Sequence, residues 1–295
     1  MEKYYSPSGK VPALAFVIFF ALLIIVIPLL ATIYAYAIWY IPVPYINFIL
    51  TGIFGFAIGW LINNIVVKYG KVRSSKWAMI FAIIAALVAI YVHWAVWIDL
   101  VMNISGVVGG DELGVATSNA KIGEVLALIL SPGGLWEIMG EINKVGVWGI
   151  KGGTVSGTFL TVIWVLEFLI ILLGSLFTGG NQVGKPFCEE ENTWFNETHL
   201  SPSMAISDPQ PLLTAITEGN NKALSELILP STDSAFDHHS VVTLYDAKTG
   251  ENYMTVTNKI AKQDKEGKIS FQDQSLIEYL NVNQSVVDAI KQKLV

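Results

Sequence analysis

The chain has 295 residues, of which 53% are hydrophobic and 14% are charged, against about 25% charged residues in a typical soluble domain. Its formal net charge of −6 argues against a nucleic-acid-binding protein, because phosphate binding needs clustered cations. The single cysteine, Cys188, excludes an internal disulfide. This composition is typical of a membrane protein.

Four apolar segments are long enough to cross about 30 Å of hydrocarbon as helices, which takes roughly 20 residues each. They are residues 11–40, 46–67, 77–101 and about 157–178. The apolar stretch of the first is about twice the 7–15 residues of a signal peptide, so we expect it to stay in the mature protein. We predict four transmembrane helices, with Pro28 kinking the first.

Basic residues predict the orientation of these helices, since short cytoplasmic loops are enriched in Lys and Arg. The connection between the second and third segments contains Lys68, Lys71, Arg73 and Lys76. The connection at 41–45 has no charge. We therefore expect both termini in the cytoplasm, residues 102–156 facing outward, and a bacterial inner membrane as the location.

Small and polar residues recur at helical spacing on three of the segments. Such narrow faces let membrane helices approach closely. We predict helix packing through Gly52, Gly55, Gly59, Ala82, Ala86, Ala89, Gly157, Thr161 and Gly174.

Three polar residues inside the predicted spans are the candidates for a functional site: Asn63, His93 and Glu167. Counted from the outer helix ends, Glu167 and His93 fall at similar depth, so we predict that they face each other. A charge at the bilayer centre costs about 2.5–3.5 kcal/mol or more, and a partner offsets part of that cost. The alternative is that Glu167 is neutral and only joins two helices by a hydrogen bond. Asn63 could likewise do no more than form a hydrogen bond to a neighbouring helix.

The outward segment is too polar for a fifth span, yet it contains two amphipathic patterns. One follows Ser118 as a helix cap, and the other follows Ser131 and Pro132, a helix start signal. We predict two short helices that lie on the membrane surface, form a lid over the bundle, or form a re-entrant element, with Trp136 and Trp148 at the interface. The acids Asp111, Glu112, Glu124, Glu137 and Glu141 read as a solvated face.

Beyond residue 180 the chain is acidic, with sixteen Asp and Glu against nine Lys. Residues 181–207 read as an acidic linker, and Cys188 lacks the second cysteine that a zinc knuckle requires. Residues 208–295 predict an α+β domain with a helix pair, a β-hairpin and a closing helix. We find no catalytic motif and predict no enzyme, no cofactor and no metal site.

The predicted fold is a membrane all-α bundle of four transmembrane helices with an outward amphipathic-helix segment, plus a small cytoplasmic α+β domain. The leading functional hypothesis is a homo-oligomeric membrane scaffold or adaptor whose C-terminal domain binds a soluble cytoplasmic protein or mediates self-assembly. The alternative is a subunit of a proton or ion channel or transporter that uses Glu167 and His93.

Overall fold

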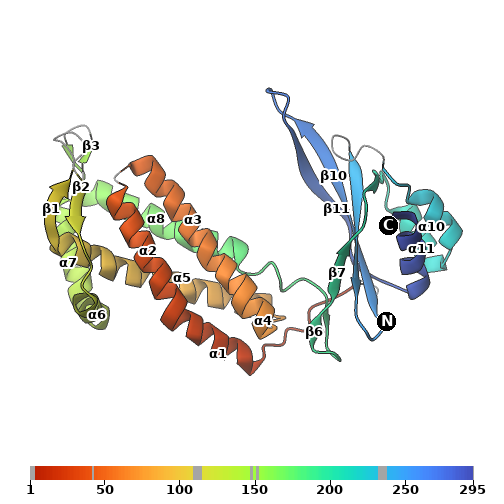
Figure 1. Ribbon diagram of the computed structural model, residues 1–295, viewed down its shortest axis with the longest axis horizontal. Helices are drawn as coiled ribbons and strands as arrows, with labels where there is room; N and C mark the ends of the chain where they lie inside the picture. Colours follow the sequence, from red (N-terminus) through yellow and green to blue (C-terminus); the bar gives the residue numbers. More distant parts are fainter. Residues whose placement is uncertain are drawn as a thin grey trace. The chain divides into compact units, whose positions relative to one another are not determined.

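The computed structural model describes residues 4–41, 43–108, 115–146, 149–150, 153–231 and 238–294 (Figure 1). The chain divides into two compact units. We call Gly9–Val183 the helical unit, and Met1–Ser8 with Gly184–Val295 the sheet unit. The combination of apolar helices with a small sheet region agrees with the sequence prediction at this level.

Among the described residues of the helical unit, four helices are long and apolar enough to span a membrane. The first consists of α1 (Ala13–Ala21), the π-helical turn η1 (Leu22–Val26) and α2 (Ile27–Tyr40). The second consists of α3 (Pro44–Leu61), η2 (Ile62–Val67) and α4 (Lys68–Gly70). The third is α5 (Ser75–Met102), and the fourth is α8 (Gly157–Thr178).

A π-helical turn accommodates the proline of the first span. Pro28 has no backbone N–H, and its ring would crowd the carbonyl four residues earlier in a regular α-helix. The turn widens just before it, where the Ile27 N–H bonds to the Leu22 carbonyl, five residues back. The helix therefore continues through Pro28 to Tyr40.

Glycines allow α3 and α8 to pack closely side by side. A Cβ atom on Gly55 would lie 2.8 Å from the Ile171 carbonyl oxygen, and one on Gly59 would collide with the Thr178 hydroxyl group. On α8, a Cβ on Gly174 would lie 3.2 Å from the Gly55 backbone. By contrast, nothing described lies within 4 Å of a Cβ built on Gly52.

Replacing Gly59 by Ala should destabilise the bundle by about 1–3 kcal/mol, because the added methyl forces the two helices apart. The matched Gly52→Ala variant should be neutral or stabilising by up to about 1 kcal/mol, since Ala favours helix and meets open space there. Thermal unfolding of the full chain in detergent measures the difference. Equal melting temperatures for the two variants would contradict the close contact.

The described residues of 102–156, the segment that we expect to face outward, contain the two predicted helices and two short strand pairs. Strands β1 (Ile104–Val108) and β2 (Val115–Ser118) pair antiparallel. Helices α6 (Ile122–Leu130) and α7 (Pro132–Val145) follow, and the two-residue strands β3 (Gly149–Ile150) and β4 (Gly153–Thr154) precede α8. Helix α7 begins at the expected proline. The start predicted for α6 is wrong, because Ser118 ends strand β2 and Lys121 occupies the N-cap position.

Hydrogen bonds from aromatic side chains fasten this segment to the ends of α2 and α5. The Trp39 indole donates to the Ala116 carbonyl at 2.8 Å, and the Tyr40 hydroxyl donates to the Ser118 carbonyl at 2.6 Å. The Tyr91 hydroxyl donates to the Ile129 carbonyl at 2.8 Å. Apolar side chains of α6 and α7 join the core of the bundle, namely Val125, Leu135 and Ile142. These contacts show that the segment packs against the bundle. Trp148, Asp111 and Glu112 lie outside the described residues.

The sheet unit has strands in the order β11-β10-β9-β7, with β8 also paired to β9. Its strands are β7 (Asn196–His199), β8 (Ser203–Met204), β9 (His239–Asp246), β10 (Asn252–Gln263) and β11 (Ile269–Val282), and its helices are α9 (Gln210–Glu218), α10 (Asn221–Leu227) and α11 (Gln284–Leu294). A separate small hairpin joins β5 (Phe187–Cys188) to β6 (Thr193–Trp194). Helices α10 and α11 cover one face of the sheet (Figure 1).

The segment predicted as an acidic linker, 181–207, is largely part of the folded sheet unit. It contains β5 to β8, and both β7 and β8 pair with β9. Its apolar residues explain this difference, because Phe187, Cys188 and Phe195 are buried. Their burial anchors a segment whose acidic residues remain near the surface.

Tyrosines form the second face of the sheet. Tyr245 and Tyr253 are buried, and the rings of Tyr245 and Tyr279 lie 5.3 Å apart. Tyr5, which precedes the first span, packs edge-on against Tyr253 at 5.5 Å and donates its backbone N–H to the Tyr279 carbonyl. Burial raises the pKa of Tyr245, Tyr253 and Tyr279, and nearby acidic groups such as Glu197 and Glu251 add to the effect.

These raised pKa values predict alkaline unfolding of the sheet unit. Unfolded tyrosines ionise near pH 10, whereas the buried ones keep their protons. Their contribution to stability is therefore full below about pH 10 and falls as the pH rises further. In the detergent-solubilised chain, tyrosinate absorbance and loss of near-UV circular dichroism should appear together. The Tyr253→Phe variant should show a weaker dependence of stability on pH. The control variant Tyr69→Phe, at an exposed position, should show the same dependence as the parent chain.

Candidate functional site

Glu167 of α8 faces the interior of the bundle. The Tyr34 hydroxyl of α2 donates to Glu167 Oε1 at 2.6 Å. The Nε2 atom of His93, on α5, lies 3.6 Å from the same oxygen. The Glu167 side chain is 17% exposed and that of His93 is 2% exposed. The structure thus brings together the two residues that the sequence analysis paired and adds a third.

The contacts continue to α3, so each of the four long apolar helices contributes a residue. The hydroxyl groups of Tyr34 and Thr51 lie 2.7 Å apart. Thr51 donates in turn to the Asn47 carbonyl at 2.8 Å, one helical turn away. We call Tyr34, Thr51, His93 and Glu167, with the Asn47 carbonyl, the polar centre.

Aromatic rings surround the polar centre. Tyr34 stacks on Phe54 with ring centroids 4.2 Å apart, and its ring lies 4.7 Å from that of His93. Trp94 lies beside His93 at 5.8 Å and packs edge-on against Trp164 at 4.8 Å. Hydrogen bonds in such a low-dielectric environment are strong, and leaving a polar group there without a partner is costly.

The number of hydroxyl hydrogens in the polar centre decides whether all of its hydrogen bonds can form at once. Tyr34 and Thr51 carry one hydroxyl hydrogen each. Three oxygen–oxygen contacts of 2.6, 2.7 and 2.8 Å connect Glu167, Tyr34, Thr51 and the Asn47 carbonyl, and each needs one hydrogen. If Glu167 is ionised, only two hydrogens are present, and one of the three contacts has no hydrogen in it. A proton on the Glu167 carboxyl group supplies the third hydrogen.

Two buried atoms near these contacts have no hydrogen-bond partner among the described residues. They are His93 Nδ1 and Asn47 Oδ1. Most buried polar atoms in proteins are bonded to protein or to ordered water. His93 and Asn47 can therefore each form one more hydrogen bond at the polar centre.

The remaining predicted polar and small residues have structural roles. Asn63 Oδ1 accepts from the Gln182 N–H at 2.7 Å and so fixes the chain just after α8. Ala82, Ala86 and Ala89 are fully buried in the face that α5 turns to the bundle. Thr161 is exposed near the start of α8 and accepts from Asn143 at 3.1 Å. No described atom lies within 4 Å of a Cβ built on Gly157, which has φ +61° where the chain enters α8.

Sequence analysis missed Tyr34 and Thr51. The first span contains three tyrosines, so the pattern does not single out Tyr34. A threonine in a helix can satisfy itself on the carbonyl four residues back, as Thr51 does. The only feature of the sequence that could have indicated Tyr34 was its position along the predicted span. Tyr34 lies six residues before the end of its span, away from the interfacial level that tyrosines favour.

A second polar cluster joins the segment around α6 to α5. Asp99 is 1% exposed and accepts from the Lys121 N–H at 2.7 Å. Asn103 donates to Asp99 Oδ1 at 3.1 Å and to Glu124 Oε2 at 2.9 Å. The bonds from Asn103 and Lys121 hold the pKa of Glu124 below its usual range. These contacts satisfy the start of α6 and act as a structural anchor.

No group of three His, Cys, Asp or Glu residues that could hold a metal ion occurs in the part of the chain that is described. Cys188 is buried, with its sulfur 3.8 Å from the Thr249 hydroxyl group.

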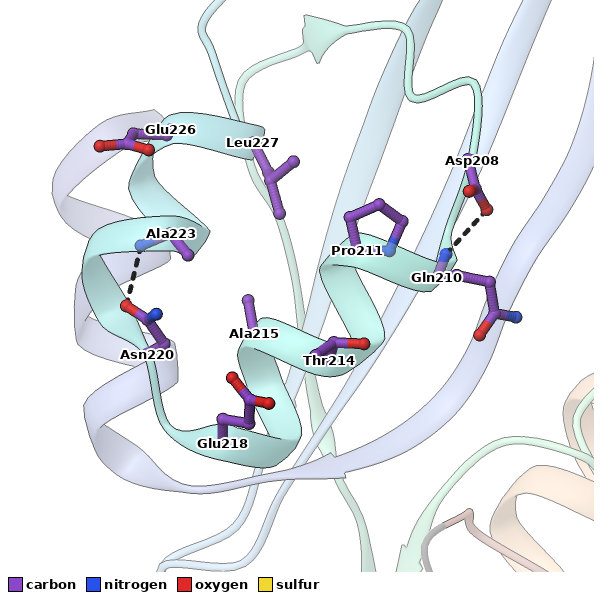
Figure 2. Close-up of a pocket in the computed structure, with 10 residues that line it drawn as sticks. All are labelled: Asp208, Gln210, Pro211, Thr214, Ala215, Glu218, Asn220, Ala223, Glu226 and Leu227. Atoms are coloured by element: carbon purple, nitrogen blue, oxygen red, sulfur yellow. Dashed lines mark hydrogen bonds between the residues drawn. The ribbon is translucent and has the colours of Figure 1, made fainter.

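An open hollow lies between α9 and α10 of the sheet unit (Figure 2). Asp208 accepts from the Gln210 N–H at 3.0 Å, and Asn220 accepts from the Ala223 N–H at 3.1 Å. These polar side chains thus cap helices and do not converge on the hollow. Glu218 and Glu226 make it acidic. Its lining offers no arrangement of reactive groups comparable to the polar centre.

Comparison with protein-family models, with curated proteins and with solved structures gives no match for this chain. Its function is therefore argued from the polar centre and from the surfaces of the two units.

Tyr34→Phe should destabilise the helical unit by about 1–3 kcal/mol, because it leaves Glu167 and Thr51 without a shared buried partner. Tyr45 is 84% exposed, so Tyr45→Phe should stay within about 0.5 kcal/mol of the parent. Thermal unfolding in detergent compares the two variants. A Tyr34→Phe protein as stable as Tyr45→Phe would contradict the hydrogen-bonded centre.

Proposed function

We propose that this chain is an integral membrane protein that binds and releases a proton at Glu167, as a subunit of a proton or ion channel or transporter. The observation that carries the proposal is the hydrogen count at the polar centre, where three short contacts share two hydroxyl hydrogens. An ionisable residue within a membrane span is costly to bury and is a functional candidate by default.

Proton uptake would reverse the direction of the hydrogen bonds in the centre. With a proton bound, Glu167 donates to Tyr34, Tyr34 donates to Thr51, and Thr51 donates to the Asn47 carbonyl. Without it, Thr51 turns to donate to Tyr34, and Tyr34 donates to the carboxylate. One proton enters or leaves, and two hydroxyl groups rotate.

His93 is the group that can exchange the proton with Glu167. Its Nε2 lies 3.6 Å from Glu167 Oε1, so a small side-chain movement brings the two into hydrogen-bond distance. Neutral His93 can accept a proton on that nitrogen, and its buried Nδ1 has no described partner that would hold it in one tautomer.

Glu167→Gln should abolish proton flux in proteoliposomes that contain the full chain, an internal pH-sensitive dye and a potassium diffusion potential. The amide keeps the shape of the carboxyl group but cannot release a proton at neutral pH. Glu137→Gln, on the outward helix α7, is the matched control and should retain flux. An infrared band of a protonated carboxyl group should also be lost in Glu167→Gln only. Unchanged flux in Glu167→Gln would contradict the proposal.

We also propose that both chain ends lie in the cytoplasm, with the basic connection around Lys71, in a bacterial inner membrane. Residues before the first span and after the fourth belong to the same unit, joined by the Tyr5–Tyr279 backbone bond. This supports an even number of crossings. It argues against the bent α6–α7 pair, with its 105° angle, as a fifth span.

A second candidate function is docking or self-assembly through the sheet unit, which would make the protein a homo-oligomeric scaffold or adaptor for a soluble protein. The observation that favours it is strand β11, which ends the strand order β11-β10-β9-β7. An edge strand presents unpaired backbone groups to other chains.

A further inference from the structure

Helix α6 packs against α5, and hydrogen bonds at its two ends fix its course. At its N-cap, the Lys121 N–H donates to Asp99 of α5 at 2.7 Å. Near its other end, the Ile129 carbonyl accepts from the Tyr91 hydroxyl of α5 at 2.8 Å. Eight positions separate Tyr91 from Asp99, which is about 12 Å along a helix. Helix α6 therefore runs back along α5, from near the Met102 end of α5 toward its middle.

Helices α6 and α7 cover the part of α5 that they pass. Earlier in α5, three large apolar side chains are exposed: Ile83, Ile84 and Leu87. From residue 88 to residue 101, none of the residues of α5 is exposed. Val125 of α6 is buried in the core of the bundle, and Ile129 packs against that core. The exposed side of α6 thus takes the place of α5 on the surface of the helical unit at this level.

The exposed side of α6 is as apolar as the side that faces the bundle. Ile122, Leu126 and Leu130 lie one helical turn apart and are 79%, 52% and 83% exposed. The helix contains a single charged residue, Glu124, which accepts from the Lys121 ammonium group at the start of the helix. A helix that is apolar all round is typical of a protein core or of a membrane. A lid in contact with water would instead be polar on its exposed side.

Helix α7 has the polar side that α6 lacks. Its residues Leu135 and Ile142 belong to the core of the bundle, whereas Glu137, Glu141 and Lys144 are exposed. An amphipathic helix of this kind suits a boundary with water. The two helices follow each other at an angle of 105°. They are thus suited to different surroundings, apolar for the exposed side of α6 and aqueous for that of α7.

The bend between α6 and α7 limits the number of unpaired backbone groups. The Ser131 N–H donates to the Leu128 carbonyl at 3.1 Å, and the Ser131 carbonyl accepts from the Leu135 N–H at 2.9 Å. Pro132, at the first position of α7, has no N–H. The proline thus removes one of the donors that the start of a helix leaves without a partner, which is an advantage in hydrocarbon.

We propose that α6 and α7 form a re-entrant hairpin, in which the exposed side of α6 contacts lipid acyl chains and the bend at Ser131 lies inside the hydrocarbon layer. The chain enters beside α5 and returns through α7 to the same side. Helix α5 has 28 residues, so when centred it extends about 6 Å beyond each face of a hydrocarbon core of about 30 Å. Tyr91, eleven residues before Met102, then lies about 10 Å inside that core.

This inference rests on the proposed insertion of the four long apolar helices into a membrane, and it is independent of the polar centre. The surface of α5 supports lipid as the occupant. Its exposed residues Ile83, Ile84 and Leu87 would face acyl chains in an inserted bundle, and the exposed residues of α6 continue that apolar surface.

Spin labels on single cysteines test the hairpin in the full chain in liposomes. Molecular oxygen concentrates in lipid, whereas a nickel chelate stays in water. We expect the ratio of oxygen to nickel collisions to be several-fold higher at Leu126→Cys and Leu130→Cys than at Gly140→Cys. Gly140 is the matched control on α7, because it is exposed and no described atom lies within 4 Å of a Cβ built there. Leu87→Cys on α5 reports membrane insertion itself, and the parent chain is the blank, since Cys188 is buried.

Lysine substitutions test the same surroundings without a label. Leu126 is 52% exposed, so Leu126→Lys should be tolerated if water covers this position. In contact with acyl chains a lysine is costly, and we therefore expect a lower melting temperature for Leu126→Lys in lipid nanodiscs. Gly140→Lys should not lower it.

The outcomes separate the hairpin from the membrane insertion on which it rests. A collision ratio at position 130 as high as that at position 87, with a lower melting temperature for Leu126→Lys only, supports the proposal. A ratio at 130 as low as that at 140 overturns the hairpin but leaves the four spans. Few collisions with either reagent at 130 would mean that protein covers α6, which overturns lipid as the occupant. A low ratio at 87 overturns membrane insertion and the hairpin together.

Discussion

The helical unit depends on the burial of one carboxyl group, that of Glu167, among apolar side chains. A carboxyl group buried without hydrogen-bond partners would be costly, so the surrounding helices must supply partners. Tyr34 and His93 do so from α2 and α5, and Thr51 extends the contacts to α3. The positions of the four spans are therefore constrained by one polar group as well as by apolar packing.

The glycine contact and the polar centre support each other. Gly55, Gly59 and Gly174 bring α3 and α8 together at backbone distance. This contact holds Glu167 on the side of α8 that faces the bundle. Were the helices separated by larger side chains, the 2.6 Å bond between Tyr34 and Glu167 would have to lengthen or break. Small residues thus position a polar group to which they make no direct bond.

The sequence predicts the helices better than it predicts their partners. Hydropathy and length identify the four apolar helices, because both are local properties. The pairing of Glu167 with His93 follows from depth alone, whereas the partners of Tyr34 could not be found, because its long side chain bonds to groups on two other helices. The role of residues 181–207 was misjudged for a related reason. Their acidic composition suggests a linker, but the burial of Phe187 and Phe195 depends on strands far along the chain.

The placement of Tyr4 and Tyr5 in the sheet unit has a consequence for folding. These residues precede the helical unit in the chain, whereas their partners on β11 follow it. Closure of this part of the sheet joins residues that some 270 positions separate, so it depends on one of the longest-range contacts in the chain. A long-range pairing of this kind forms slowly, because the entropy of closing the loop must be lost before the pair forms.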